Sequence, residues 1–151
     1  MKRSHILALA LLLMMFGCSK SGLIEQRIGE RVDHCKSTDT CIIRIRELTD
    51  FEWDQMHVFE YGARRDEIEK ALGVPFPDYV EFKRRIVFLK DGKIVHREDE
   101  PTDIECPIDR QVSFGGSNAG SHWSFTPDTA VFSAEKKEFI GGVYYVLRQV
   151  K

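Results

Sequence analysis

The sequence has little net charge and no long apolar run, and each absence excludes a class of protein. It contains 22 lysines and arginines against 24 aspartates and glutamates, which gives a formal charge of −2 at pH 7. So nearly neutral a chain has no strong attraction to nucleic acid. The apolar run over 6–16 is too short to cross a bilayer as a helix, which takes about 20 residues. We therefore expect neither a nucleic-acid-binding protein nor a membrane-spanning one.

Spacings typical of metal and cofactor sites are also missing. The histidines are dispersed, and neither His-x-x-x-His nor Cys-x-x-Cys occurs. Gly115 and Gly120 have the outer spacing of a phosphate-binding loop, but Ser121 stands where that loop needs a lysine. The sequence therefore predicts no metal and no cofactor.

Signals for catalysis are weak. The stretch around Ser117 approaches a nucleophile elbow, but an elbow needs a helix after the serine, and residues 123–127 look extended. Cys106 alternates with Ile104 and Ile108, which predicts a small inward-facing side chain rather than an activated thiol. We expect no enzyme, and keep a small hydrolase using Ser117 or a thiol enzyme using Cys106 as an alternative.

What the sequence does have is an N-terminus laid out as an export signal, in which Lys2 and Arg3 precede the apolar run. Met15-Phe16-Gly17-Cys18 follows this run and resembles the lipobox of bacterial lipoproteins, although Leu is usual in place of Met15 and a smaller residue in place of Phe16. The resemblance implies that 1–17 is a signal peptide and that Cys18 becomes the lipidated N-terminus. Two or more acyl chains anchor a protein stably to a membrane. The alternatives are an uncleaved anchor and a plain secreted chain.

The residues after Cys18 bear on location. Ser19 is not the aspartate that retains many lipoproteins in the inner membrane, whereas Lys20-Ser21 resembles a retention pair used in some bacteria. We expect the periplasmic face of the bacterial envelope, with the outer membrane preferred over the inner. Residues 18–22 would form the lipidated cysteine and a tether shorter than about 20 Å. A single domain would then occupy 23–151, close to the membrane.

Export makes disulfides possible, and an acylated Cys18 leaves three thiols. Cys35 ends an apolar helical stripe and Cys41 begins the next strand, so a bridge between them would join helix to strand. A bridge involving Cys106 and no bridge at all remain open.

The periodicity of apolar residues predicts an α+β fold. A helix is expected over 23–34 and another from Asp66 to Leu72, where Gly73 ends it. Asp91-Gly92 predicts a two-residue hairpin turn. Within that hairpin, Leu89 should face Ile94, Val87 should face His96, and Phe88 should face Val95. With further strands over 41–46, 51–61, 112–114, 123–125, 131–132 and 143–150, we expect a mainly antiparallel sheet of six to seven strands with two helices packed on one face.

The remaining features suggest a binding role. Aromatic side chains outnumber what two short helices need to cover, so some form either ordinary core or a binding surface. The basic groups 64–65 and 83–85 are expected to form a solvated surface or, as the alternative, to meet anionic lipid headgroups, while the acidic group 98–100 is expected to be a solvated turn. The domain resembles small envelope lipoproteins of unknown role, which implies no particular binding residue. We expect a non-catalytic protein-binding or assembly lipoprotein, and as an alternative an immunity-type inhibitor of a periplasm-acting toxin.

Overall fold

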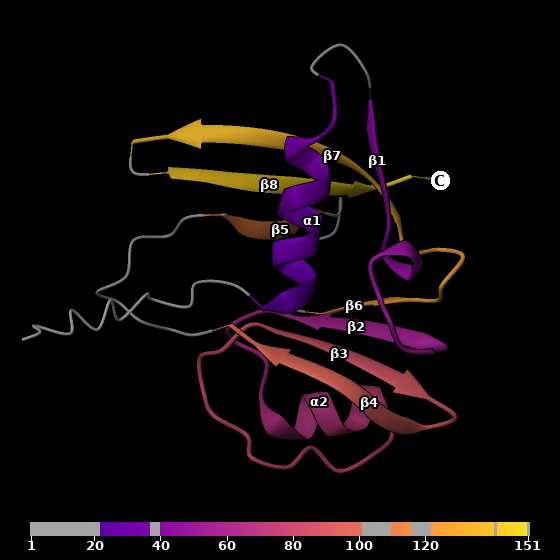
Figure 1. Cartoon of the computed structure of the whole chain (residues 1–151). Helices are drawn as coiled ribbons and strands as arrows, with labels where there is room; N and C mark the ends of the chain where they lie inside the picture. Colours follow the sequence, from indigo (N-terminus) through magenta and orange to yellow (C-terminus); the bar gives the residue numbers. More distant parts are fainter. Residues whose placement is uncertain (1–21, 37–39, 101–109, 116–121, 141, 151) are drawn as a thin grey trace, which may run out of the picture.

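The fold is seen in a computed structural model that describes residues 22–36, 40–100, 110–115, 122–140 and 142–150 (Figure 1). The described strands form two four-stranded sheets, ordered β1-β7-β8-β5 and β4-β3-β2-β6, and their pairings are antiparallel except for the parallel pair β5–β8. The elements are α1 (Leu23–Asp33), β1 (Cys41–Arg44), a 3-10 turn (Ile45–Glu47), β2 (Gln55–Phe59), α2 (Arg65–Leu72), β3 (Arg85–Lys90), β4 (Lys93–Asp99), β5 (Gln111–Gly115), β6 (His122–Phe125), β7 (Val131–Phe139) and β8 (Gly142–Gln149).

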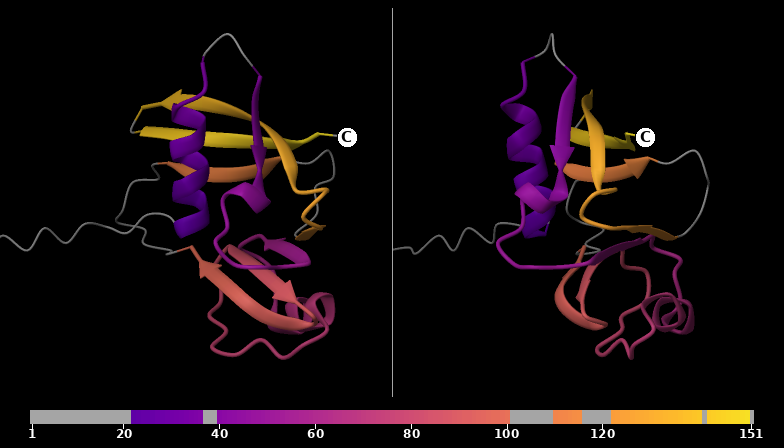
Figure 2. Two further views of the ribbon diagram at one scale, coloured as in Figure 1. Left: turned by 45° about the vertical axis from the view of Figure 1, so that its right-hand side comes forward. Right: turned by 90° about the vertical axis from the view of Figure 1, so that its right-hand side faces the viewer.

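One hydrophobic core fills the space between the two sheets and is closed on one side by α1 (Figures 1 and 2). Ile24, Ile28 and Val32 recur at helical spacing and form the buried stripe of α1. The helix lies close to the β1-β7-β8-β5 sheet, because a Cβ added at Gly29 would be 2.8 Å from Cε2 of Tyr145. This close approach explains a glycine in the middle of the helix.

A second core lies on the other side of the β4-β3-β2-β6 sheet, where α2 covers it. Ile68 and Leu72 of α2 pack with Phe59, Val87 and other buried residues of the sheet. Because β3 contributes to both cores, five of its six residues are buried. Of the helices that the structure describes, only α1 packs on the other sheet, on one of its faces.

The sequence predictions for the helices are confirmed closely. The first helix ends one residue earlier than expected, and the second ends at Gly73, whose φ of 71° is the left-handed conformation that favours glycine. Asp66 in the first turn of α2 forms an ion pair with Arg64, 2.8 Å apart. Neither described helix is long and apolar enough to cross a membrane.

The β3–β4 hairpin confirms its predicted turn but not its full register. Asp91 and Gly92 both have positive φ, 50° and 69°, as a type I′ turn requires, and Leu89 pairs with Ile94. Beyond that point Phe88 pairs with His96 and Val87 with Arg97, so the expected pairs Val87–His96 and Phe88–Val95 are wrong. The cause is a β-bulge that leaves Val95 as an extra, exposed residue on β4.

The α+β class and the predominance of antiparallel pairing are confirmed. In detail, the chain crosses between the two sheets after β1, β4, β5 and β6, so the described strands are shared between two sheets rather than collected in one. Each helix consequently packs on a different sheet (Figure 2). α1 packs on the face of the β1-β7-β8-β5 sheet that is turned toward the main core, and α2 packs on the face of the β4-β3-β2-β6 sheet that is turned away from it.

Candidate functional site

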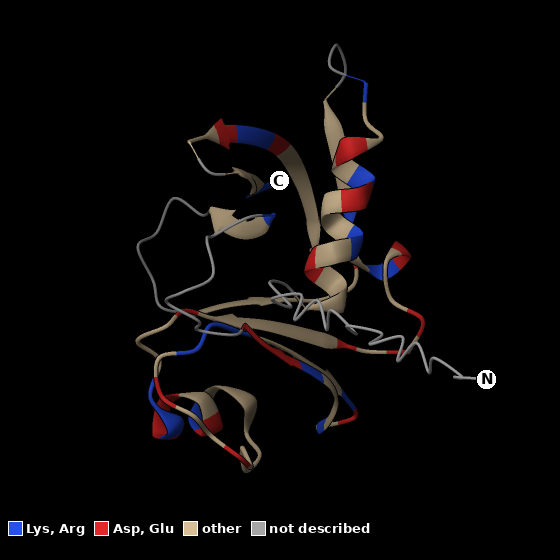
Figure 3. Cartoon of the chain, turned by 60° about the vertical axis from the view of Figure 1, so that its left-hand side comes forward, with Lys and Arg blue, Asp and Glu red and all other residues tan. Residues whose placement is uncertain are grey.

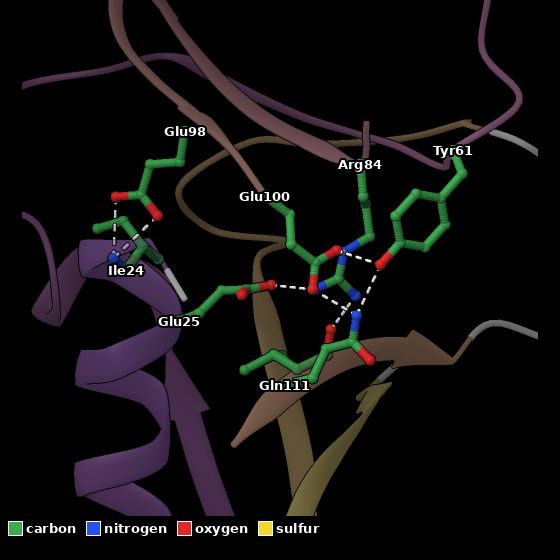
Figure 4. A network of polar contacts seen from close by, with 8 residues as sticks. Ile24, Glu25, Tyr61, Arg84, Glu98, Glu100 and Gln111 are labelled. Carbon is green, nitrogen blue, oxygen red and sulfur yellow. Dashed lines mark hydrogen bonds and ion pairs between the residues drawn. The ribbon is translucent and has the colours of Figure 1, made fainter. Parts of the chain in front are cut away.

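A buried polar cluster joins α1 to the ends of β4 and β5 (Figure 4). Its centre is Arg84, which precedes β3 and whose side chain is 4% exposed. The guanidinium contacts the carboxylates of Glu25 and Glu100, the latter at 3.2 Å from Nε, and donates a hydrogen bond to the carbonyl of Val112. One cation thus lies between two acids and a backbone acceptor from three different elements.

Further polar side chains complete the cluster. Tyr61 donates its hydroxyl proton to Glu100, and Gln111 donates from Nε2 to Glu100 and, over 2.7 Å, to the Tyr61 oxygen. The carboxylate of Glu98 accepts the backbone N–H of Ile24 at 2.9 and 3.1 Å. A negative charge at this point satisfies an unpaired amide of the first helical turn and complements the helix dipole.

Burial alters the acidity of these groups. It raises the pKa of Glu25 to about 8, because desolvation outweighs the attraction of Arg84, and Glu100 and Glu98 raise it further. Burial also raises the pKa of Tyr61, and the hydrogen bond to Glu100 adds to that rise. Burial therefore favours the protonated form of Glu25.

The cluster encloses too little space for a substrate. The cavity beside it is about 10 Å³ and is lined by residues that include Gly22, Glu25 and Glu98. That is the space of about one water molecule. One oxygen of Glu25, Oε2, has no hydrogen-bond partner among the described residues. Within the described part of the chain, the ion pairs and hydrogen bonds of the cluster hold α1 in place beside this small cavity.

A histidine pair lies on β2 and the edge strand β6. Nδ1 of His57 is 2.9 Å from Nε2 of His122, and Nε2 of His57 is 3.2 Å from Oε1 of Gln55. When Nε2–H of His57 donates a hydrogen bond to Oε1 of Gln55, Nδ1 of His57 carries no proton and accepts a hydrogen bond from Nε2–H of His122. In neutral His122, Nδ1 is then unprotonated. Burial lowers the pKa of both rings, that of His57 to about 4. Both histidines are thus neutral at pH 7, and the described residues contain no third ligand that would complete a metal site.

A further feature with functional potential is the face of the β1-β7-β8-β5 sheet that no described helix covers, which we call the outer face. Tyr145 and Leu147 of β8 point into the core, so their neighbours Tyr144 and Val146 point outward, as do Ile42 and Val131 of the adjoining strands. These four apolar side chains are partly exposed. Neither helix of the described chain lies on this face, because α1 packs on the opposite one.

Charged side chains border the apolar residues of the outer face. Glu135 of β7 pairs with Lys137 and, at 3.1 Å, with Arg148 of β8. These are ion pairs at a solvated surface, which contribute little to the free energy of folding.

The tip of the β7–β8 hairpin, which we define as Phe139 and Ile140, also has functional potential. The Ile140 side chain is fully exposed and Phe139 is 43% exposed. The Phe139 ring packs edge-on against Tyr144 with ring centroids 5.9 Å apart. The tip therefore presents two large apolar side chains at one end of the outer face.

Of the residues singled out from sequence, Cys35 and Cys41 are joined by a disulfide, with the sulfurs 2.06 Å and the Cα atoms 5.7 Å apart. This is the pairing that the sequence favoured. Cys18, Cys106 and Ser117 lie outside the described residues. His96 is hydrogen-bonded within its sheet through Nε2 to Glu98 at 2.7 Å.

The Arg84 cluster was missed, and two predictions about its members are wrong. The basic group 83–85 was expected to be solvated or near lipid, yet Arg84 and Arg85 are buried. The acidic group 98–100 was expected to be a solvated turn, yet Glu100 is buried against Arg84. The available signal was two arginines placed directly before the apolar run over 86–89.

Comparison of the chain with protein-family models, with curated proteins and with solved structures finds no match. The functional assignment therefore depends on the residues themselves.

Proposed function

We propose that this protein is a lipid-anchored lipoprotein of the bacterial envelope that binds a protein partner through its outer face and catalyses no reaction. The observation that carries the proposal is the open sheet face itself, with Tyr144 and Val146 at its centre and Glu135 and Arg148 at its border. Protein interfaces combine such an apolar, aromatic centre with a charged rim. The proposed mode of action is recognition.

The buried clusters support a structural rather than a chemical role for the rest of the molecule. Arg84 and its acids fix α1 against the edges of both sheets, and their cavity has the space of about one water molecule. A helix fixed in this way leaves the opposite face of the β1-β7-β8-β5 sheet rigid and available. Preorganised surfaces lose less entropy on binding than mobile ones.

The anchor is the other half of the proposal. Acylation of Cys18 would place the domain within about 20 Å of a bilayer, since the tether is short. The outer membrane is preferred over the inner, because Ser19 is not the aspartate associated with inner-membrane retention.

A site-specific photo-crosslinker tests the proposed interface in native membranes. We expect the reagent placed at Tyr144 to capture a protein, whereas the same reagent at Glu30, exposed on α1, should not. Adding Val146→Glu should abolish the product, because it places a charge in the apolar centre. Equal capture from both positions, or capture that survives Val146→Glu, would contradict the proposal. The identity of the captured protein distinguishes an assembly partner from a toxin held by an immunity-type inhibitor.

A further inference from the structure

We infer that the tip of the β7–β8 hairpin inserts into the lipid bilayer beside the anchor, so that the domain touches the membrane at two points. The inference rests on the proposed lipidation of Cys18. It assigns a lipid-binding role to Phe139 and Ile140.

The first step is the exposure of the tip. A fully exposed isoleucine beside a phenylalanine that is 43% exposed leaves apolar surface in water at the end of the β7–β8 hairpin, which extends to one side of α1 (Figure 1). Such surface has an unfavourable hydration free energy, which insertion into a hydrocarbon layer removes.

The second step is reach. Asp33, the last residue of α1, holds the hairpin through Lys136 at 2.9 Å and Tyr145 at 3.1 Å. From Lys136 to Ile140 the strand extends about 13 Å, at about 3.3 Å per residue. The five residues 18–22 before α1 can extend about 17 Å. The β7–β8 hairpin crosses α1 and extends to one side of the helix (Figures 1 and 2). A membrane surface parallel to the helix axis on that side would therefore be within reach of both the hairpin tip and the lipid anchor at the end of the tether.

The third step is charge, which decides what kind of membrane contact this is. The part of β7 that leads to the tip contains two acidic and two basic residues, Glu135, Lys136, Lys137 and Glu138 (Figure 3). Lys136 is paired with Asp33, and Lys137 with Glu135. With no excess positive charge, the contact is apolar insertion rather than attraction to anionic headgroups. It therefore requires no anionic lipid.

Fluorescence quenching by brominated lipids tests insertion directly. Full-length acylated Ile140→Trp protein is reconstituted into phosphatidylcholine vesicles with plain or brominated acyl chains, and Phe82→Trp serves as the matched control. Phe82 is 69% exposed and lies in the loop between α2 and β3, away from the hairpin. We expect bromination to reduce the signal of the added tryptophan in the Ile140→Trp protein about twofold more than in the control, because bromines quench only at close range inside the hydrocarbon.

The outcomes separate the inference from the proposal beneath it. If the protein is acylated and vesicle-bound but Ile140→Trp is quenched no more than Phe82→Trp, the tip does not insert and the anchor stands. If intact-mass analysis finds Cys18 unmodified, the proposed anchor is wrong and the inference falls with it. Since the Ile140 side chain is fully exposed, the substitution should leave the unfolding midpoint unchanged, which confirms that quenching is compared between folded proteins.

Discussion

At the scale of single residues, Arg84 determines whether buried acids are tolerated. Replacing it by methionine keeps the apolar stem but leaves Glu100 without its counterion, and removal of one partner from a buried ion pair costs about 3–5 kcal/mol. We expect Arg84→Met to lose that much free energy of unfolding in urea titrations. Arg46→Met is the matched control, because the Arg46–Asp128 pair is exposed and such pairs contribute at most about 1 kcal/mol. Equal losses in both variants would contradict the structural role of Arg84.

Glu25 predicts an unusual dependence of stability on pH. Its pKa is about 8 in the folded protein against 4.5 as the reference value, so the folded state binds the proton more tightly. This contribution is complete below pH 4.5 and is lost as the pH rises toward 8, with a slope of up to about 1.4 kcal/mol per pH unit. We expect the free energy of unfolding to fall over this range more steeply in the wild type than in Glu25→Gln. Parallel pH profiles in urea titrations would show that Glu25 is ionised in the fold.

The residue scale also shows where sequence information ends. The Cys35–Cys41 disulfide was predictable, because both cysteines lie at the ends of elements that their own periodicity identifies. The partners of Arg84 were not, since Glu25 is 59 residues away and a charged residue in a sequence reads as solvated until its neighbours are known.

At the scale of elements, the disulfide connects the end of α1 to the start of β1. Closing a loop of this size contributes about 2 kcal/mol by restricting the unfolded chain. We expect Cys35→Ala/Cys41→Ala to lose about that amount in urea titrations without reductant. In reductant the wild type should approach the double variant. A difference that persists there would mean that packing of Cys41, rather than the bridge, is responsible.

Local signals predicted the elements better than their partners. The turn at Asp91-Gly92 could be predicted because a type I′ turn needs positive φ at both central residues, and Asp-Gly is a favoured pair for that conformation. The bulge beyond it was not, because the extra residue is tolerated only once β4 becomes the edge of a four-stranded sheet. The parallel pairing of β5 with β8 likewise depends on contacts between distant segments.

At the scale of the whole molecule, the two sheets differ in how they are covered. Among the described residues, the β4-β3-β2-β6 sheet has a core on each face, whereas no helix covers the second face of the other sheet. The sequence predicted the α+β class from its periodicities. It could not identify the open face, because a half-exposed valine or tyrosine on β8 has the same alternating pattern as one beneath a helix.

The attachment of α1 has a mechanical consequence. The first helical turn is held by Glu98 of β4 through the Ile24 amide and by Arg84 through Glu25. A pull on the chain before Gly22 would therefore load these side-chain bonds before it could unwind the helix. Force applied at the proposed membrane anchor would pass into the β4-β3-β2-β6 sheet, which has a core on each face.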